Sequence, residues 1–438
     1  MNLIVIMLDS LRTDYVGAYV NGKAKAKTPN MDRFASEAIV FDKAYAGSFP
    51  TLPCRRDLFT GRWGHPFNTW NRMERDVPTL AGRLRADGYT TGLVFDTPMF
   101  MTEGNNLDRG FGSIEWIRGQ GGEPWVSDGF IDVPWPGGPD KVKPGVQRYL
   151  ANMSRRLFET DYLGPQVMQK AVHWLERNYA REHFFLWIDS WDPHEPWDPL
   201  QRHLALYEGR DLPRRVMREG ELDEKPPQHK AHREMHATTG HESVIDMYSP
   251  TEEDVDRMRR HYYAKITTVD EKLGQVVDAL QEMGYLENSL LIFCSDHGEL
   301  LGDHWMAYKW LMYDPIVHVP MIVRDGRRVA ELGGQHTDDL TSLMDIGPTV
   351  LQAAGLEVPT YLEGRSLQPY WEGKDESFAP RQWVFCEDNY QIMMRGQRHK
   401  LVYYIGQEAG ELYDLQEDPH ELHNLWDRAE CSTLRAEL

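Results

Sequence analysis

Short apolar runs alternate with amphipathic segments along the chain. Three runs are apolar almost throughout, as strands covered on both faces of a parallel sheet tend to be: residues 2–8, 183–188 and 290–294. A further strand is predicted over residues 90–95, so the four predicted strands are, in order, 2–8, 90–95, 183–188 and 290–294. Helical periodicity or a helix-starting turn marks the segments between them: residues 28–35, 78–84, 165–180 and 252–283. This alternation predicts an α/β fold whose large domain has a mixed, mainly parallel sheet between helices.

Two segments interrupt the alternation, and the pattern changes near the C-terminus. Residues 102–145 are rich in Gly, Pro and Trp, and residues 205–250 are polar, so both are predicted to be insertions over the sheet edge. Beyond about residue 350 the apolar runs are short: residues 382–386, 390–394 and 400–404. We therefore predict a catalytic domain over residues 1–350 and a small C-terminal α+β domain with an antiparallel sheet over residues 351–438.

Charge narrows the classes of partner. The 438 residues carry a formal net charge of −20, which argues against nucleic acid and against an anionic membrane surface, because both attract basic proteins. A small anionic substrate remains compatible, since a bound metal and a few local cations can reverse the field within one pocket.

The N-terminal run ends on Asp9 and has no basic region before it, unlike a secretory signal peptide. No apolar run reaches the ~18 residues of a membrane span, and the four cysteines form no CxxC pair. These features predict a cytoplasmic protein without a membrane partner.

Acidic and histidine side chains follow three of the predicted strands. Asp9 ends the first run, Asp192-Pro193-His194 follows the third, and Ser295-Asp296-His297-Gly298 follows the fourth. Ligands of open α/β sheets bind at the carboxyl ends of strands. A single Asp there is usually a turn former or helix cap, but adjacent carboxylate and imidazole groups suit a divalent ion such as Mn, Zn or Fe.

Several blocks together resemble the sulfatase family of the alkaline-phosphatase superfamily. They are residues 2–9, Thr28-Pro29-Asn30-Met31-Asp32, Phe59-Thr60-Gly61-Arg62, residues 295–304, Asp345-Ile346-Gly347-Pro348-Thr349 and Glu411-Leu412-Tyr413-Asp414. The resemblance implies an alkaline-phosphatase-like fold and a metal-dependent hydrolase. It also implies that Asp9, Asp296 and His297, with the nucleophile, hold one divalent ion.

The implied ligand set is similar to that of the phosphonate monoester hydrolase and phosphodiesterase branch. A set with two carboxylates and one histidine favours Mn, Zn or Fe. Common sulfatases instead use an all-oxygen set, which suits Ca, so Ca remains possible for this family member. Ser10 stands where the family often has a further ligand.

Residues 48–61 contain the position at which sulfatases carry the cysteine that becomes formylglycine. Aligning Pro53, Arg55 and Thr60-Gly61 with the family's pattern puts Thr51 at that position and leaves Cys54 out of register. A secondary alcohol cannot become formylglycine, but it can attack phosphorus when a cation lowers its pKa. The alternative is that Thr51 only caps a helix.

The resemblance implies roles for five more residues. Arg55 and Lys309 would contact the ester oxygens, and His194 would protonate the leaving group. Structural alternatives are a salt bridge for Arg55, a solvated side chain for Lys309 and a turn position for His194. Asn71 and Thr97 are similar to substrate-binding residues of the phosphonate branch.

These assignments predict hydrolysis of phosphodiesters or phosphonate monoesters, with a small anionic ester as substrate. A sulfatase with an unmodified Thr51, a phosphotransferase or phosphomutase, and a binding protein without activity are the alternatives. The aromatic loop with Trp116, Trp125 and Trp135 fits a pocket wall, a lid or an oligomer contact, so a homo-oligomer stays open. The histidines His229, His232, His236 and His241 follow no ligand spacing and favour a solvated insertion.

Overall fold

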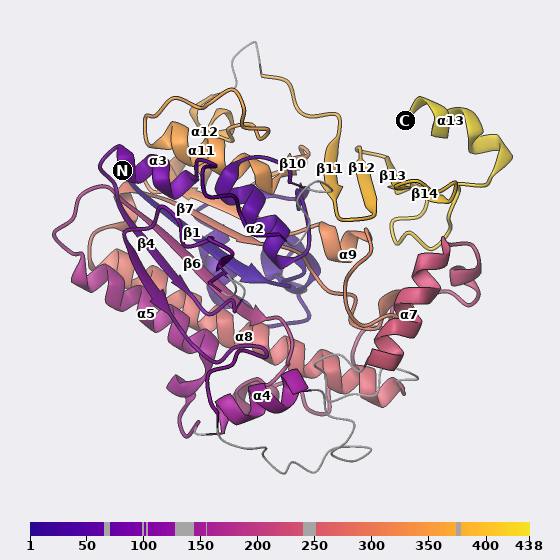
Figure 1. Ribbon diagram of the computed structural model, residues 1–438, viewed down its shortest axis with the longest axis horizontal. Coiled ribbons are helices and arrows are strands. Elements are labelled where there is room, and N and C mark those ends of the chain that lie inside the picture. Colours follow the sequence, from indigo (N-terminus) through magenta and orange to yellow (C-terminus); the bar gives the residue numbers. More distant parts are fainter. Residues whose placement is uncertain are drawn as a thin grey trace.

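A computed structural model describes residues 1–64, 71–98, 100–101, 104–127, 144–154, 156–239, 251–373 and 378–438. Within these residues the predicted fold class is confirmed: an eight-stranded mixed sheet lies between helices, and a separate four-stranded antiparallel sheet lies near the C-terminus (Figure 1).

The large sheet has the strand order β5-β4-β6-β1-β7-β8-β2-β9. Its strands are β1 (Asn2–Asp9), β2 (Ile39–Phe41), β4 (Thr90–Phe95), β5 (Ser113–Trp116), β6 (Phe184–Pro193), β7 (Ser289–Ser295), β8 (Met321–Asp325) and β9 (Gln335–Thr337). The strands from β5 to β7 are all parallel, whereas β8 is antiparallel to both of its neighbours. A two-stranded sheet pairs β3 (Ala44–Tyr45) with β10 (Thr341–Ser342).

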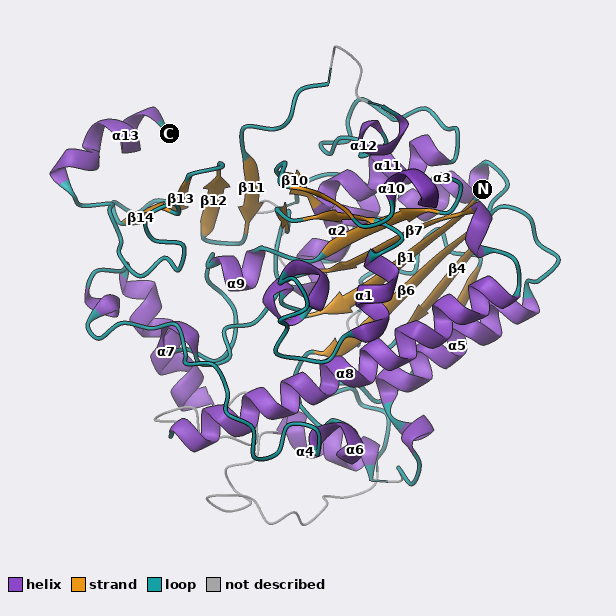
Figure 2. Ribbon diagram, turned by 180° about the vertical axis from the view of Figure 1, so that it is seen from behind, coloured by secondary structure: helices purple, strands orange, loops and turns teal. Residues whose placement is uncertain are grey.

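Both faces of the large sheet are covered, which is why its central strands are apolar throughout. Leu3 and Val5 of β1 pack in one core, and Ile4 and Ile6 pack in another on the opposite face. The first core contains residues of α2 (Thr51–Thr60), α3 (Leu80–Ala86) and α11 (Ile346–Ala353), and the second contains residues of α1 (Pro29–Ala35), α5 (Leu163–Arg177) and α8 (Glu252–Glu282) (Figure 2).

The shorter helices lie around these layers. They are α4 (Pro144–Met153), α6 (Gln201–Leu204), α7 (Pro227–Thr239), α9 (Asp314–Val317), α10 (Val329–Leu332), α12 (Pro369–Glu372) and α13 (Ser432–Glu437). None of the described helices is both long and apolar enough to cross a lipid bilayer.

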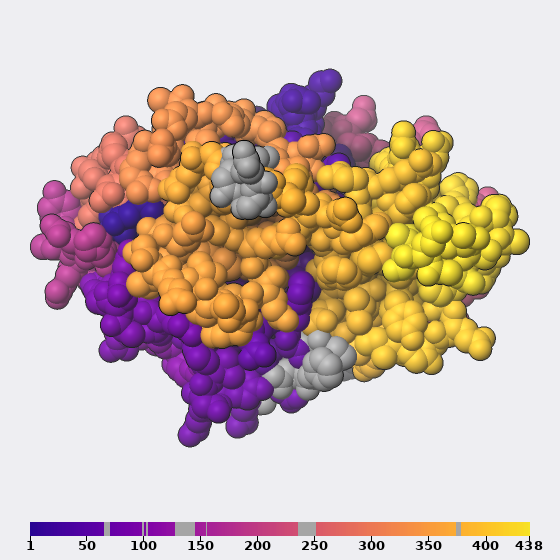
Figure 3. Space-filling model, turned by 90° about the horizontal axis from the view of Figure 1, so that it is seen from above, coloured from indigo at the N-terminus to yellow at the C-terminus, as the bar shows by residue number. Residues whose placement is uncertain are grey.

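The C-terminal sheet consists of β11 (Val384–Glu387), β12 (Gln391–Arg395), β13 (His399–Tyr404) and β14 (Gly410–Asp414). It forms one end of the molecule, where the last residues of the chain lie (Figure 3). Helix α7 contacts it directly, because His229 is fully buried against Glu411 of β14, with 3.0 Å between Nε2 and Oε1.

Two sequence predictions need correction. The segment 102–145 contains β5, one of the two edge strands of the large sheet. The histidine run is not simply solvated, because His229 is buried and His232 is half-buried. Trp135 and His241 lie outside the described residues.

Candidate active site

Three buried side chains meet at the carboxyl ends of β1 and β7. Asp9 is the last residue of β1, and Asp296 and His297 directly follow β7, the parallel neighbour of β1. All three are fully buried, and one ligand atom from each lies within 4.8 Å of the others. Paired parallel strands thus bring together residues nearly 290 positions apart in the chain. These residues form the Asp–Asp–His cluster.

The cluster fits a divalent cation. His297 Nδ1 lies 2.9 Å from the Gly298 carbonyl, so Nε2 faces Asp9 Oδ1 and Asp296 Oδ2, each 3.6 Å away. Nε2 of His297 and Oδ2 of Asp9 are buried without a hydrogen-bond partner. Burial lowers the pKa of His297 to about 4, so the ring is neutral at pH 7, as a metal ligand must be. A mixed oxygen and nitrogen donor set suits Mn, Zn or Fe.

Ser10 holds both carboxylates of the cluster. Its backbone is left-handed, with φ of 65°. The amide nitrogen donates to Asp296 Oδ1 over 3.1 Å, and the hydroxyl donates to Asp9 Oδ1 over 2.9 Å. Ser10 therefore orients Asp9 and Asp296 through hydrogen bonds, the kind of support that usually surrounds metal ligands.

Helix α2 brings Arg55 into the same site. Thr51 opens the helix, is 2% exposed, and its carbonyl accepts a hydrogen bond from Arg55 Nη1 over 3.1 Å. The same Nη1 lies 2.5 Å from Asp296 Oδ2 and 3.2 Å from Asp9 Oδ2. The start of α2 and the cluster are thus joined through one guanidinium group.

Asp189 in β6 is a site residue that the sequence analysis missed. It accepts hydrogen bonds from Arg55 Nε over 3.0 Å and from Nη2 over 2.8 Å. Trp187 Nε1 adds another, over 3.0 Å. The sequence signal that could have revealed Asp189 is its position within an apolar strand, since a charged residue is rarely fully buried unless it is paired.

The two predicted substrate-binding residues lie in different surroundings. Thr97 is fully buried, and its hydroxyl donates to Asp189 Oδ1 over 2.6 Å, so it supports the partner of Arg55. Asn71 is exposed. A contact of either residue with substrate stays a prediction.

His194 and Lys309 are in direct contact. Lys309 Nζ lies 2.7 Å from His194 Nε2, and His194 Nδ1 lies 2.7 Å from the Glu195 carbonyl. Burial, and next to it the charge of Lys309, lower the pKa of His194 well below its ordinary value. His194 is therefore neutral, with Nδ1 donating to the carbonyl and Nε2 accepting from the ammonium group. His194 Nε2 is also 4.0 Å from Asp9 Oδ1, so the pair borders the cluster.

Two glutamates keep the Lys309 ammonium charged. Its Nζ lies 3.4 Å from Glu195 Oε2 and 3.5 Å from Glu299 Oε2. Although burial opposes the charge, both glutamates raise the pKa of Lys309. Glu299, which the sequence analysis did not assign, is fully buried.

Comparison with known proteins identifies the family of this chain. The family profile described as Sulfatase matches residues 1–356, and that described as N-sulphoglucosamine sulphohydrolase, C-terminal, matches residues 302–438. The chain belongs to the sulfatase family. Sulfatase-family enzymes are hydrolases that bind a divalent metal ion, consistent with the donor set of the Asp–Asp–His cluster.

Some similar proteins are named as sulfatases, and others as an alkaline phosphatase superfamily protein or a phosphonate monoester hydrolase. An arylsulfatase of Clostridium perfringens is 26% identical over 97% of this chain and 90% of its own length. A multifunctional alkaline phosphatase superfamily protein of Trinickia caryophylli is 25% identical over 97% and 91%. The phosphonate monoester hydrolase of Agrobacterium radiobacter has a TM-score of 0.80 and 24% identity, covering 100% of this chain and 93% of that structure.

Cys54, the other candidate in the nucleophile segment, is 1% exposed within α2. Burial raises the pKa of its thiol well above the ordinary value, so the sulfur is protonated at pH 7.

Proposed function

We propose that this sulfatase-family hydrolase cleaves phosphodiesters or phosphonate monoesters with Thr51 as its nucleophile. The observation that carries the proposal is the residue at position 51: a buried threonine at the start of α2, whose carbonyl shares Arg55 Nη1 with Asp9 and Asp296. A threonine cannot become formylglycine, but its alkoxide can attack phosphorus.

Asp9, Asp296 and His297 would hold one divalent metal, with Thr51 Oγ1 as a further ligand. When bound, the ion would lower the pKa of the Thr51 hydroxyl and polarise the ester. Mn, Zn or Fe suits these donors better than Ca.

In the proposed reaction, the Thr51 hydroxyl releases its proton to solvent, and Oγ1 then forms a bond to phosphorus while the bond to the leaving alkoxide breaks. Arg55 and Lys309 stabilise the negative charge that develops on the ester oxygens. Water then attacks phosphorus, the bond between phosphorus and Thr51 Oγ1 breaks, and a proton of the water restores the Thr51 hydroxyl. Both steps keep phosphorus at one oxidation level and need no redox partner.

The geometry of His194 refines its proposed role as the acid. Because Nε2 accepts from Lys309 and Nδ1 donates to a carbonyl, we propose that the proton given to the leaving alkoxide comes from Lys309, directly or through His194.

Sulfate ester hydrolysis is the second candidate, because most of the similar sequences are named sulfatases. Initial rates on 4-nitrophenyl phenylphosphonate, bis(4-nitrophenyl) phosphate and 4-nitrophenyl sulfate compare the two directly. We expect the phosphorus esters to react at least tenfold faster, whereas faster sulfate turnover would reject the proposal.

Variants at position 51 test the nucleophile. We expect Thr51→Ala to lose activity by about a thousandfold or more, and Thr51→Ser to keep most of it. Mass spectrometry after acid quenching should find the phosphorus group on the Thr51 peptide of the wild type and not on that of Thr51→Ala. Unchanged turnover by Thr51→Ala would exclude this residue as the nucleophile.

A further inference from the structure

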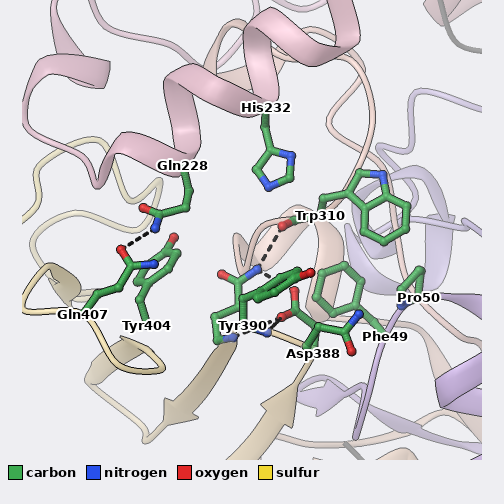
Figure 4. A pocket seen from close by; sticks show the side chains of 11 residues that line it. Phe49, Pro50, Gln228, His232, Trp310, Asp388, Tyr390, Tyr404 and Gln407 are labelled. Atoms are coloured by element: carbon green, nitrogen blue, oxygen red, sulfur yellow. Dashed lines mark hydrogen bonds between the residues drawn. The ribbon is translucent and has the colours of Figure 1, made fainter. Parts of the chain in front are cut away.

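A cavity of about 310 Å³ lies between α7 and the C-terminal sheet (Figure 4). Phe49 and Pro50, which line it, directly precede Thr51, and Trp310, also in its wall, directly follows Lys309. The Phe49 ring meets His297 edge-on, with 6.5 Å between ring centroids. The cavity therefore borders the candidate active site. Its volume is at the low end of the range of about 300–1,000 Å³ for small-molecule sites, which suits a single ring.

Aromatic and amide side chains form most of the wall. The rings belong to Phe49, Trp310, Tyr390 and Tyr404. Three amide oxygens of lining residues have no hydrogen-bond partner: Oε1 of Gln228, Oδ1 of Asn389 and Oε1 of Gln391. Amide oxygens only accept hydrogen bonds, and a buried acceptor without a donor is costly. Three of them around one cavity indicate that the missing donors belong to water or to a ligand.

The orientation of the Gln391 amide follows from its contacts. Its Nε2 donates to the Trp310 carbonyl over 2.9 Å and to Asp388 Oδ2 over 2.6 Å (Figure 4). Both partners are acceptors, so the amide cannot be reversed. Oε1 is therefore the atom left without a donor.

A second amide pair joins the two sides of the cavity. Gln228 of α7 and Gln407, which follows β13, are 2.5 Å apart between Nε2 and Oε1. The inserted helix is thus held next to the C-terminal sheet at this cavity (Figure 4).

The cavity has little net charge. No lysine or arginine is among the described residues that line it. Asp388 accepts hydrogen bonds from the Tyr390 and Gln391 amides and from the Gln391 side chain, and burial raises its pKa to about 6. Burial lowers the pKa of His232 to about 4, so this ring is neutral at pH 7. An anion therefore finds no cationic partner among the described lining residues, and the negative charge of Asp388 is already engaged by two backbone amides and the Gln391 side chain.

We infer that this cavity binds an uncharged, hydroxyl-bearing ring, the alcohol portion of the ester, with ring faces against the aromatic side chains and hydroxyls donating to the amide oxygens. The assignment of this ring to the leaving alcohol rests on the proposed function. Binding of the ring itself can be measured without turnover.

The test uses the full chain and four kinds of probe. Methyl β-D-glucopyranoside, myo-inositol, phenol and choline chloride are compared by saturation-transfer NMR and as inhibitors of 4-nitrophenyl phenylphosphonate hydrolysis. We expect at least one of the two polyols to bind in the millimolar range and to inhibit competitively. The variants Gln228→Met and Asn389→Leu should together weaken polyol binding about tenfold, because two acceptors are lost. Gln416→Met, the same change at an exposed position outside the cavity, should bind like the wild type.

Each result decides the inference. Loss of polyol binding in the double variant, with phenol binding unchanged, supports it. Three results would overturn it: stronger binding of choline than of the polyols, equal binding of phenol and the polyols, or no polyol binding by the wild type. The wild-type measurements remain decisive even if the double variant fails to fold. Polyol binding without hydrolysis of any phosphorus ester would reject the proposed function alone, whereas hydrolysis without polyol binding would reject the ring site alone.

Discussion

Arg55 and Asp189 form a fully buried ion pair in which the carboxylate accepts from both Nε and Nη2 of the guanidinium, over 3.0 and 2.8 Å. The remaining nitrogen, Nη1, is thereby aimed at Asp296 and at the Thr51 carbonyl. The guanidinium group is planar and rigid, so once Nε and Nη2 are held by Asp189, Nη1 can point in only one direction. Asp189 thus determines where Arg55 points without contacting the Asp–Asp–His cluster itself.

Replacing Asp189 tests this positioning. In Asp189→Asn, one amide hydrogen faces the guanidinium and the ion pair is lost. We expect kcat to fall about 10–100-fold, as for other groups that orient site residues. Thr97→Val removes only the hydrogen bond to Asp189 and should cost less. Wild-type kinetics in Asp189→Asn would contradict the positioning role, and metal content measured in parallel separates lost orientation from a lost ion.

Metal binding is predicted to stabilise the fold. A ligand at 100 times its Kd adds about 2.7 kcal/mol to the free energy of unfolding. After EDTA treatment, Mn²⁺ or Zn²⁺ should raise Tm more than Ca²⁺ does. His297→Ala should lose this response, and Ser10→Ala should keep it, because Ser10 contacts the cluster only through hydrogen bonds. A full response in His297→Ala would place the ion elsewhere.

The contact between Lys309 and His194 predicts a dependence on the leaving group. If Lys309 is the proton source, Lys309→Met should slow poor alkyl leaving groups about 10²–10⁴-fold and 4-nitrophenolate much less. His194→Ala should show the same pattern more weakly, because His194 Nε2 holds the ammonium group. Rates across a series of phosphodiesters with increasingly basic leaving groups provide the measurement. An equal loss for every leaving group in Lys309→Met would point to charge stabilisation alone.

The central strands and long helices were predictable from local pattern. Strand β4 (Thr90–Phe95) has the predicted bounds, and α8 (Glu252–Glu282) ends one residue before the predicted limit. Both follow from apolar runs or periodicity that need no information about distant residues.

What the sequence analysis missed depends on contacts between distant segments. Strand β6 continues past the predicted end at residue 188 to Pro193, because Arg55 pairs with Asp189, and Lys265 with Asp192. His229 is polar by composition yet buried, since β14 supplies Glu411 as its partner. The members of the Asp–Asp–His cluster were expected at the sheet edge because they follow apolar strands, and the resemblance to the sulfatase family singled them out as metal ligands. Asp189 was missed because its partner is 134 residues away.

Asp96 predicts a pH-dependent stability. The carboxylate is fully buried, and it accepts from the Trp191 amide over 2.7 Å and from Gln120 Nε2 over 3.1 Å. Burial, followed by the charge of Asp192, raises the pKa of Asp96 to about 7, against about 3.9 in an unfolded chain. The folded state therefore holds the proton longer than the unfolded state does. The stabilisation is complete below about pH 4 and is lost as pH rises to about 7.

Asp96→Asn removes this titration while keeping the size of the side chain. The free energy of unfolding of the variant, relative to the wild type, should therefore increase by roughly 2–3 kcal/mol between pH 5 and pH 8. Denaturant melts at a series of pH values measure the difference, and taking the difference cancels the titrations that both proteins share. Asp211→Asn, at an exposed position, should show no such trend. A difference that is flat or that falls with pH would mean that Asp96 is already ionised in the folded protein, and that the amide of Trp191 and the side chain of Gln120 stabilise its charge more than burial opposes it.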